Sequence, residues 1–413
     1  MFRPYIFHID FDCYFVSAIR ALKPNLKNKP IAIANKHPNA VAISVSYDLR
    51  DKGIRAGWKV SKILQLEPKT IIEQPRFDLY ITTSNAIFRH LKKYYAKQFE
   101  IGSIDECYLL IPENIDNDEK AMNYAQKIQT DVYQNFSIPI TIGISKTKFY
   151  AKMTTNYFKP NKIGLTNESN YQERFFNLDI IEYHGIGKRL SERFKDMQIN
   201  TIGDLYQLTP GDIRLTTIFR TAGIKFLQQL DFFQNNDTFQ STSDIKGISR
   251  DITFHKKEID TDFITKNIEM QAEKVSQSLQ RIYKVGNLIS FGIRTFEQGW
   301  IIKHQKISEH IDKATEIAKI CIQMYYDYFI NHKIIGISIR ISELINSFEN
   351  FRNLSILQQN KPSKSNYVVD QIIYKVNTTL KQKSLKTLAD YNIDRIKKRR
   401  GQSDQIEVGV FKR

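Results

Sequence analysis

The segment Ile101–Ile111 reads IGSIDECYLLI, and it places two adjacent carboxylates, Asp105 and Glu106, at the start of an apolar run. Pro112 and polar residues follow the run, so we expect a short and mostly buried strand. Burial of one carboxylate costs several kcal/mol unless a cation meets it, and burial of two side by side costs more. The neighbouring sequence offers no such cation, so we expect a positive partner from elsewhere.

A second stretch of the same kind opens the chain as IFHIDFDCYF, where Asp10 and Asp12 interrupt an apolar run. If the two strands are neighbours in one sheet, then Asp10, Asp105 and Glu106 converge at one end of it. Side chains alternate between the faces of a strand, so Asp105 and Glu106 can share one ion only at a strand end or kink. Carboxylate oxygens without histidine or thiolate suit Mg²⁺. A solvated turn is the alternative for an isolated acidic pair.

The composition favours a nucleic-acid partner. The chain has 413 residues, 41% hydrophobic composition and a formal net charge of +17. This length predicts about three or four domains. So basic a protein is expected to bind a polyanion, either nucleic acid or an anionic membrane surface. No apolar run approaches the ~20 residues that span a bilayer, and the N-terminus lacks a signal-peptide core, so the membrane alternative loses weight.

The cysteines and histidines point to no metal or disulfide framework. Cys13, Cys107 and Cys321 are widely spaced and odd in number, which is typical of a reducing cytoplasm. Cys13 and Cys107 lie near the acidic residues, and we interpret them as buried core thiols and not as nucleophiles. The eight histidines form no metal-binding spacing, and we assign them no role.

The order of predicted elements divides the chain. Up to about residue 165, strands alternate with amphipathic helices in α/β layers, whereas 168–233 contains short helices and 234–246 reads as a linker. A small α+β domain follows, and residues 350–413 are polar and basic, with a helical patch near 366–381. The expected helices are 80–97, 118–135, 264–282 and about 309–330, and the expected strands are 101–111, 138–144, 287–296 and 333–344.

Two further motifs supply groups that bind phosphate. AISVSYDLRDKGIRAG contains Ser44, Tyr47 and Arg50, whose three-residue spacing puts them on one face if the segment is helical after Ser44. TIGISKTKFYAKMTTNYFKPNKIG adds Lys159, which precedes Pro160 where a helix gives way to a loop. The alternative for Lys159 is a partner of the helix dipole.

A glycine turn between two helical stretches reads HGIGKRL and contains Gly185, Gly187, Lys188 and Arg189. Glycines let backbone N–H groups approach a phosphate, and the helix start favours its negative charge. We therefore expect this turn to bind the backbone of a nucleic acid.

Together, HIDFDCYF, SYDLRDKGIRAG, SIDECYL, GISKTKFYAKMTTNYFKPNKIG and HGIGKRL resemble the Y-family translesion DNA polymerases of the DinB/UmuC type, over essentially all of residues 4–345. The resemblance implies a multidomain α+β right-hand polymerase. Its parts are a catalytic palm at 1–12 and 77–167, fingers at 13–76, a helical, helix-hairpin-helix-like thumb at 168–233, a linker at 234–244, an α+β little finger at 245–345 and a basic C-terminal tail at 346–413.

The resemblance also implies residue roles. Asp10, Asp105 and Glu106, with the backbone carbonyl of Phe11, would hold two Mg²⁺ ions, and Asp105 and Glu106 would be catalytic. Asp12 would be structural, as a cap or hydrogen-bond acceptor. The nucleotide site would comprise Tyr14, the steric gate Phe15 that excludes a ribose 2′-hydroxyl, Tyr47, Arg50 and Lys159 on the β- and γ-phosphates, and Ser44 as a helper. The family pattern differs at Ile19, Ile43 and Trp58, which bears on the lesion preference.

The implied partners are primer–template DNA, a deoxynucleoside triphosphate (dNTP) and a bacterial sliding clamp. RNLSILQQ at 352–359 is similar to a clamp-binding peptide through Leu354, Ile356 and Leu357, and an ordinary apolar loop is the alternative. The basic run 395–400 is similar to a tail of the UmuC-like branch, with a solvated basic face as the default. We expect a monomer with no membrane contact in the cytoplasm, associated with the nucleoid.

The predicted function is template-directed, low-fidelity DNA synthesis past damaged bases. The chain has no second acidic cluster for a proofreading exonuclease, which agrees with low fidelity. A nucleotide cyclase on a similar palm is a second hypothesis, although it needs neither the glycine turn, the little finger nor the charge. A third is a catalytically weak accessory protein that binds DNA and clamp.

Overall fold

The computed structural model describes residues 3–347, except 38–39, 220–222, 233–238, 240–244 and 259. The chain divides into two compact units, Met1–Thr242 and Ser243–Arg413. None of the helices within these described ranges is both long and apolar enough to cross a membrane. The finer boundaries of palm, fingers, thumb and little finger stay predictions, and most of the expected linker lies outside the described residues.

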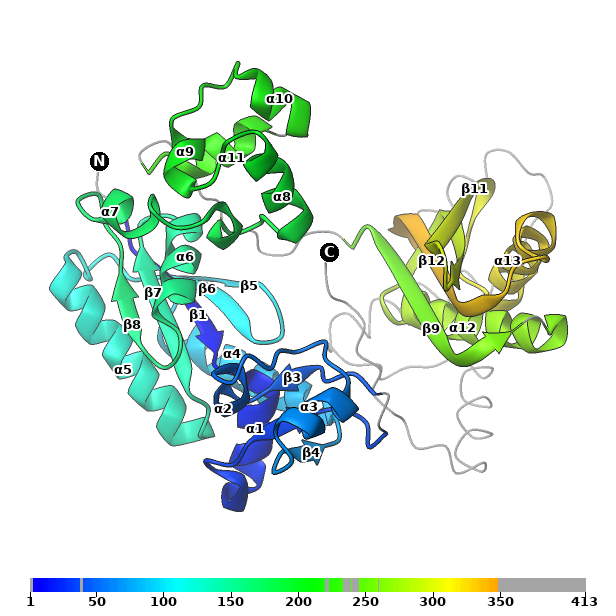
Figure 1. The fold of residues 1–413 in the computed structure, drawn as a ribbon, viewed down its shortest axis with the longest axis horizontal. Coiled ribbons are helices and arrows are strands. Elements are labelled where there is room, and N and C mark those ends of the chain that lie inside the picture. The colour runs from blue at the N-terminus through cyan, green and yellow to red at the C-terminus, as the bar shows by residue number, and fades with distance from the viewer. Residues whose placement is uncertain are drawn as a thin grey trace, which may run out of the picture. The chain divides into compact units, whose positions relative to one another are not determined.

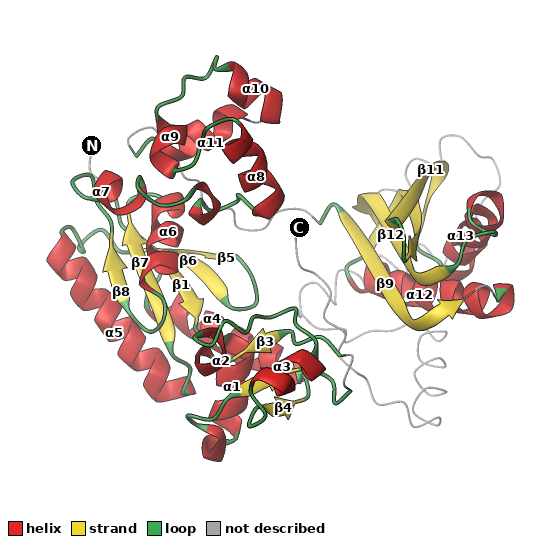
Figure 2. Ribbon diagram, viewed as in Figure 1, coloured by secondary structure: helices red, strands yellow, loops and turns green. Residues whose placement is uncertain are grey.

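The first unit is built around a five-stranded sheet (Figures 1 and 2). Its strand order is β5-β6-β1-β7-β8, in which β1 pairs antiparallel with both β6 and β7, and β7 pairs parallel with β8. The strands are β1 Ile6–Phe11, β5 Gln98–Ile101, β6 Glu106–Leu110, β7 Ile140–Ser145 and β8 Ile163–Leu165. The single strand expected over 101–111 is therefore a hairpin, and Asp105 lies in its turn.

The two faces of this sheet differ in character because side chains alternate along each strand. Phe7, Ile9 and Phe11 of β1 lie in one apolar core with residues of two long helices. On the other face of β1 lie His8 and Asp10, and His8 contacts Thr155 of a third helix. The helices are α4 Phe77–Tyr94 and α5 Asp118–Phe136 on the apolar side, and α6 Lys148–Phe158 on the polar side.

Helix α6 approaches strand β7 very closely at Gly143. A Cβ atom at this position would lie 2.1 Å from the carbonyl oxygen of Ala151, a distance that no side chain tolerates. Glycine is therefore required for α6 to rest on the sheet.

Residues that follow β1 form a small α/β layer with its own core. A three-stranded sheet has the order β3-β2-β4, and the core behind it includes Val45, Leu49 and Ile63. Its elements are α1 Tyr14–Leu22, η1 Pro24–Leu26, β2 Ile31–Ile33, β3 Ser44–Val45, α2 Tyr47–Arg50, α3 Val60–Leu66 and β4 Ile71–Glu73.

A cluster of short helices completes the first unit and shares a core with α6. Phe149, Tyr150 and Met153 of α6 pack with buried side chains of the cluster such as Phe175 and Phe194. The helices are α7 Tyr171–Phe175, η2 Ile180–Glu182, α8 Lys188–Asp196, α9 Ile202–Tyr206, α10 Ile213–Phe219 and α11 Gly223–Leu230. Helix α6 thus packs on the sheet with one side and on this helical cluster with another.

The second unit is a four-stranded antiparallel sheet with the order β11-β10-β12-β9 and two helices. Ile337, Ile339 and Ile341 of β12 face its core, as their alternation predicts, whereas Ile335 is half-buried. The elements are β9 Gly247–Glu258, α12 Thr261–Arg281, β10 Lys284–Thr295, β11 Gly299–Ile311, α13 Ala314–Tyr328 and β12 Ile334–Asn346.

The expected helix over about 309–330 begins too early, because residues up to Ile311 belong to strand β11. That strand is missing from the sequence prediction. Most of its side chains, within GWIIKHQKISEHI, are exposed, so the strand shows no alternation of buried and exposed residues. Strand β9 is missing from the prediction as well.

Candidate active site

The three predicted catalytic acids lie at one end of the first unit's sheet. Asp10 on β1 stands directly opposite Glu106 on β6, and the backbone N–H of Phe11 donates to the carbonyl oxygen of Asp105 at 2.8 Å. The prediction that the two acidic strands are neighbours is confirmed. Asp10 and Glu106 share the polar face, and Asp105 occupies the turn that precedes β6.

Two lysines from a later part of the sequence form ion pairs with two of these acids. The Lys159 ammonium lies 2.7 Å from Asp10, and the Lys152 ammonium contacts the Glu106 carboxylate directly. The Asp105 carboxylate accepts a hydrogen bond from Ser103. Lys152 thus gives Glu106 a positive partner from elsewhere in the sequence.

Lys152 and its neighbours form one row along α6. Lys148, Lys152, Thr155 and Lys159 follow the spacing i, i+4, i+7, i+11, which places them on one side of a helix. Thr155 hydrogen-bonds the ring of His8 at 2.9 Å, and Lys148 pairs with Glu100 at 2.8 Å. The sequence prediction did not include Lys152 or His8. The polar spacing along α6 is the signal from which Lys152 could have been predicted.

Burial and charge set the protonation of the site. Burial raises the pKa of Asp10 to about 6, although Lys159 opposes the rise. Burial alone would raise the pKa of Glu106 too, but the contacts with His8 and Lys152 outweigh it and hold that pKa below its usual range. Burial lowers the pKa of His8 to about 4. At neutral pH the Asp10 and Glu106 carboxylates are therefore ionised and the His8 imidazole is neutral.

The donor atoms fit a hard divalent cation in their chemistry. Asp10, Asp105 and Glu106 supply oxygen atoms, and a strand end brings them together, as Mg²⁺ requires. Yet across the described part of the chain, no three side chains of His, Cys, Asp or Glu gather closely enough to enclose an ion. In this structure Glu106 instead pairs with Lys152, and Asp10 pairs with Lys159.

Asp12 is a buried hydrogen-bond acceptor, as predicted. Its carboxylate accepts hydrogen bonds from the hydroxyl of Tyr47 at 3.0 Å, the hydroxyl of Thr141 at 2.9 Å and the backbone N–H of Asn161 at 2.9 Å. Burial raises its pKa, and these donors oppose the rise. Asp12 thereby fastens Tyr47 to the sheet next to Asp10.

The predicted phosphate-binding groups sit around this same corner. The Arg50 guanidinium lies 5.0 Å from the centre of the Tyr47 ring, and its Nε donates to the Val45 carbonyl at 3.3 Å. Ser44 is buried in strand β3, whereas helix α2 begins at Tyr47. The expectation of one helical face is therefore wrong for Ser44.

The Phe15 ring is half-buried and rests on aromatic neighbours. It stacks on Tyr80 with ring centres 4.3 Å apart and meets Phe77 edge-on at 6.1 Å. Tyr14 is buried, and its hydroxyl donates to the carbonyl of Tyr80. Only the backbone of Tyr14 is thus left for the predicted nucleotide contact, while Phe15 retains an exposed edge.

The glycine turn leads into helix α8. Gly185 has a φ of +106°, which favours glycine, and Gly187 is the residue before the helix, with open space beside it. The Lys188 side chain is 86% exposed, and Arg189 is also exposed. The predicted clamp peptide with Leu354, Ile356 and Leu357 lies outside the described residues.

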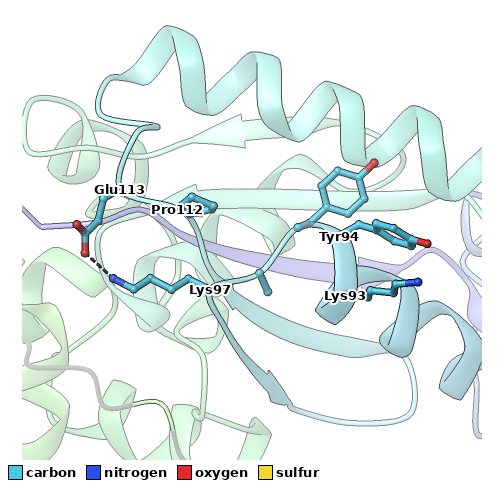
Figure 3. Close-up of a pocket in the computed structure, with 7 residues that line it drawn as sticks. Lys93, Tyr94, Lys97, Pro112 and Glu113 are labelled. Atoms are coloured by element: carbon cyan, nitrogen blue, oxygen red, sulfur yellow. Dashed lines mark hydrogen bonds and ion pairs between the residues drawn. The ribbon is translucent and has the colours of Figure 1, made fainter.

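A hollow at the opposite end of β6 is distinct from this site (Figure 3). It is lined by Lys93, Tyr94, Lys97, Pro112 and Glu113, and Lys97 pairs with Glu113 across it. None of the predicted catalytic acids reaches it. The acids at the start of β6 therefore define the candidate active site.

Comparison with known families agrees with this geometry. The model of the impB/mucB/samB family matches residues 9–156, and the model of the C-terminal domain of the same family matches residues 245–356. The two matches together span well over half of the sequence. The chain belongs to the impB/mucB/samB family.

Members of the impB/mucB/samB family with known names are similar over most of their length. DNA polymerase IV of Lactococcus lactis subsp. cremoris is 27% identical over 343 residues, which cover 81% of this chain and 93% of that protein. DNA polymerase IV of Bacillus velezensis is 26% identical over 382 residues, which cover 92% of this chain and 90% of that protein.

Solved Y-family structures share the fold. A Y-family DNA polymerase chimera of Dbh and Dpo4 segments matches with a TM-score of 0.74 and 22% identity, covering 83% of this chain and 99% of that one. DinB from Sulfolobus solfataricus matches with a TM-score of 0.55 and 22% identity, covering 82% and 98%. The predicted multidomain α+β hand, with palm, fingers, thumb and little finger, is confirmed.

Proposed function

We propose that this protein is a template-directed, low-fidelity DNA polymerase that copies past damaged bases by transferring a dNTP onto a primer 3′-hydroxyl. The observation that carries the proposal is the convergence of Asp10, Asp105 and Glu106 at one end of the sheet. Membership of the impB/mucB/samB family and the similarity to named DNA polymerase IV proteins support it. The hypothesis of an inactive accessory protein is not favoured by these matches.

The same acids are the groups that would hold the metal. Asp10, Asp105 and Glu106, with the carbonyl of Phe11, would bind two Mg²⁺ ions. When bound, such a pair of ions stabilises the charge on the attacking and leaving oxygens of a phosphoryl transfer. The carboxylates would have to exchange their lysine partners for the ions.

The chain's own cations would take the triphosphate. Lys159, Arg50 and Tyr47 lie at the same corner as Asp10 and Asp12, where their positive charge and hydroxyl suit the β- and γ-phosphates. Lys159 would be free to bind a phosphate if Asp10 instead held a metal ion. The exposed edge of Phe15 would meet the sugar and reject a ribose, with Ser44 behind the phosphates as a helper.

DNA binding would use exposed positive charge. The turn at Gly185 and Gly187 presents Lys188 and Arg189, and the net charge of +17 favours the phosphate backbone. Among the fold relatives is a structure titled as the insertion ternary complex of Dbh DNA polymerase, with a TM-score of 0.58. We propose primer–template DNA and dNTP as substrates, the peptide at 352–359 as a sliding-clamp ligand, and a monomer as the working form.

Primer extension tests the function directly. The wild type, with Mg²⁺ and all four dNTPs, is expected to extend a primer on an undamaged and on a lesion-bearing template, whereas Asp105→Ala/Glu106→Ala is expected to be inactive. Glu113→Ala, which removes an acid at the other end of the sheet, is the matched control and is expected to match the wild type. Extension by the double variant, or none by a wild type that binds DNA, would overturn the proposal.

A further inference from the structure

The Glu106 carboxylate is enclosed by protein groups on several sides. The Lys152 ammonium contacts it directly, and Nε2 of His8 lies 3.6 Å away. A Cβ atom at Gly102 would lie 3.0 Å from Oε1 of Glu106, so the backbone of the β5–β6 turn also lies close to this carboxylate. The carboxylate therefore already has a cationic partner within the protein.

Lys152 is itself fixed in place. Its side chain is 10% exposed, and its ammonium also lies 3.5 Å from Nε2 of His8. The tight contact of α6 with Gly143 and the hydrogen bond between Thr155 and the His8 ring hold the helix on the sheet. If Glu106 turns away, Lys152 keeps a buried charge without an anionic partner, which is costly.

A divalent cation at Glu106 therefore meets two obstacles. It must separate a buried ion pair, and it must then sit near the positive charge of Lys152. Lys148, one turn earlier on the same helix, pairs with Glu100 in strand β5. Lys152 is the lysine of this helix that contacts Glu106.

We propose that Lys152 is a positioning residue that competes with divalent cations for Glu106 and so lowers the metal affinity of the polymerase before its substrates bind. This inference rests on the proposed function, because it assumes that Glu106 is a metal ligand. It adds a residue whose effect is to weaken metal binding, and it predicts that removal of a lysine tightens it.

Direct metal binding tests the inference without any turnover. Free Mn²⁺ is measured by electron paramagnetic resonance during titration of the DNA-free protein. Lys152→Met, which keeps the length of the side chain but removes its charge, is expected to bind Mn²⁺ about tenfold more tightly than the wild type. Lys148→Met on the same helix is the matched control and is expected to leave the affinity unchanged. Lys152→Arg retains the charge and is expected to stay near the wild type.

The outcomes separate the inference from the proposed function. Mn²⁺ binding by Lys152→Met that equals or falls below the wild type, or is absent in both, overturns the competition. If Lys152→Met binds tightly but the addition of Asp105→Ala leaves that binding intact, the ion is elsewhere and the metal assignment of the proposed function fails instead. Melting curves in EDTA establish that each variant is folded, and Lys152→Gln replaces Lys152→Met if the latter is not.

Discussion

The two large sheets of this polymerase differ in whether their covered face carries charged side chains. In the sheet β5-β6-β1-β7-β8, the face under α6 carries Asp10, Glu106 and His8 beneath lysines. In the sheet β11-β10-β12-β9, the covered face is apolar and β11 leaves its polar side chains exposed. Buried ion pairs are poor stabilisers, so their concentration in one sheet marks where chemistry is placed.

The largest expected contrast between the sheets is catalytic. Asp10→Asn should lower the rate of nucleotide incorporation by at least about a thousandfold, because a ligand of the proposed metal site loses its charge. Asp251→Asn neutralises an exposed acid on β9 and should leave the rate at saturating DNA unchanged. Single-nucleotide incorporation kinetics measure both. Equal losses in the two variants would remove the functional distinction between the sheets.

A core substitution tests the second sheet's role as a stabilising layer. Ile339→Ala removes a fully buried side chain of β12 and should lower the free energy of unfolding by about 2–5 kcal/mol. Urea denaturation followed by circular dichroism measures the change. A loss below about 1 kcal/mol would show that this core is less closely packed than its apolar face implies.

Sugar selection sharpens the comparison at the edge of the catalytic sheet. Phe15→Ala should reduce discrimination against ribonucleotides by roughly a hundredfold, because it removes the ring, stacked on Tyr80, that we propose to block a 2′-hydroxyl. Incorporation of dNTP and its ribonucleotide counterpart on the same primer provides the ratio. Unchanged selection would place the gate elsewhere.

The polar face also predicts a dependence of stability on pH. The pKa of His8 is lowered to about 4 in the folded protein from an ordinary value near 6.5, so its stabilising contribution is present above pH 6.5 and is lost as the pH falls towards 4. Between pH 7 and 5, in EDTA, this loss should reach about 1–2 kcal/mol. His8→Gln should show a shallower fall in stability over that range. Parallel curves for the two proteins would contradict the assignment.

The smallest expected effect belongs to the exposed face of the second sheet. Lys303→Ala on β11 should weaken DNA binding by less than about tenfold and reduce the slope of log K against log salt by about 1. Its incorporation rate at saturating DNA should match the wild type. Binding isotherms at several salt concentrations test this, and an unaltered slope would mean that Lys303 meets no phosphate.

The sequence predicted what depends on local pattern. The polar interruptions at Asp10 and at Asp105–Glu106 predicted their convergence, and the alternating isoleucines of β12 predicted its core face. The pairing of Lys152 with Glu106 was not predictable in this way, because it depends on α6 crossing the polar face. Strand β11 was missed because most of its side chains are exposed and leave no periodicity to read.

Helix α6 contacts two different parts of the first unit. Phe149 and Met153 are packed among α7–α11, while Lys152 and Thr155 contact the acids and His8 of the sheet. A displacement of the helical cluster that moved α6 would therefore also move Lys152 relative to Glu106. The position of this cluster is thus one of the variables that set the charge balance around the acids.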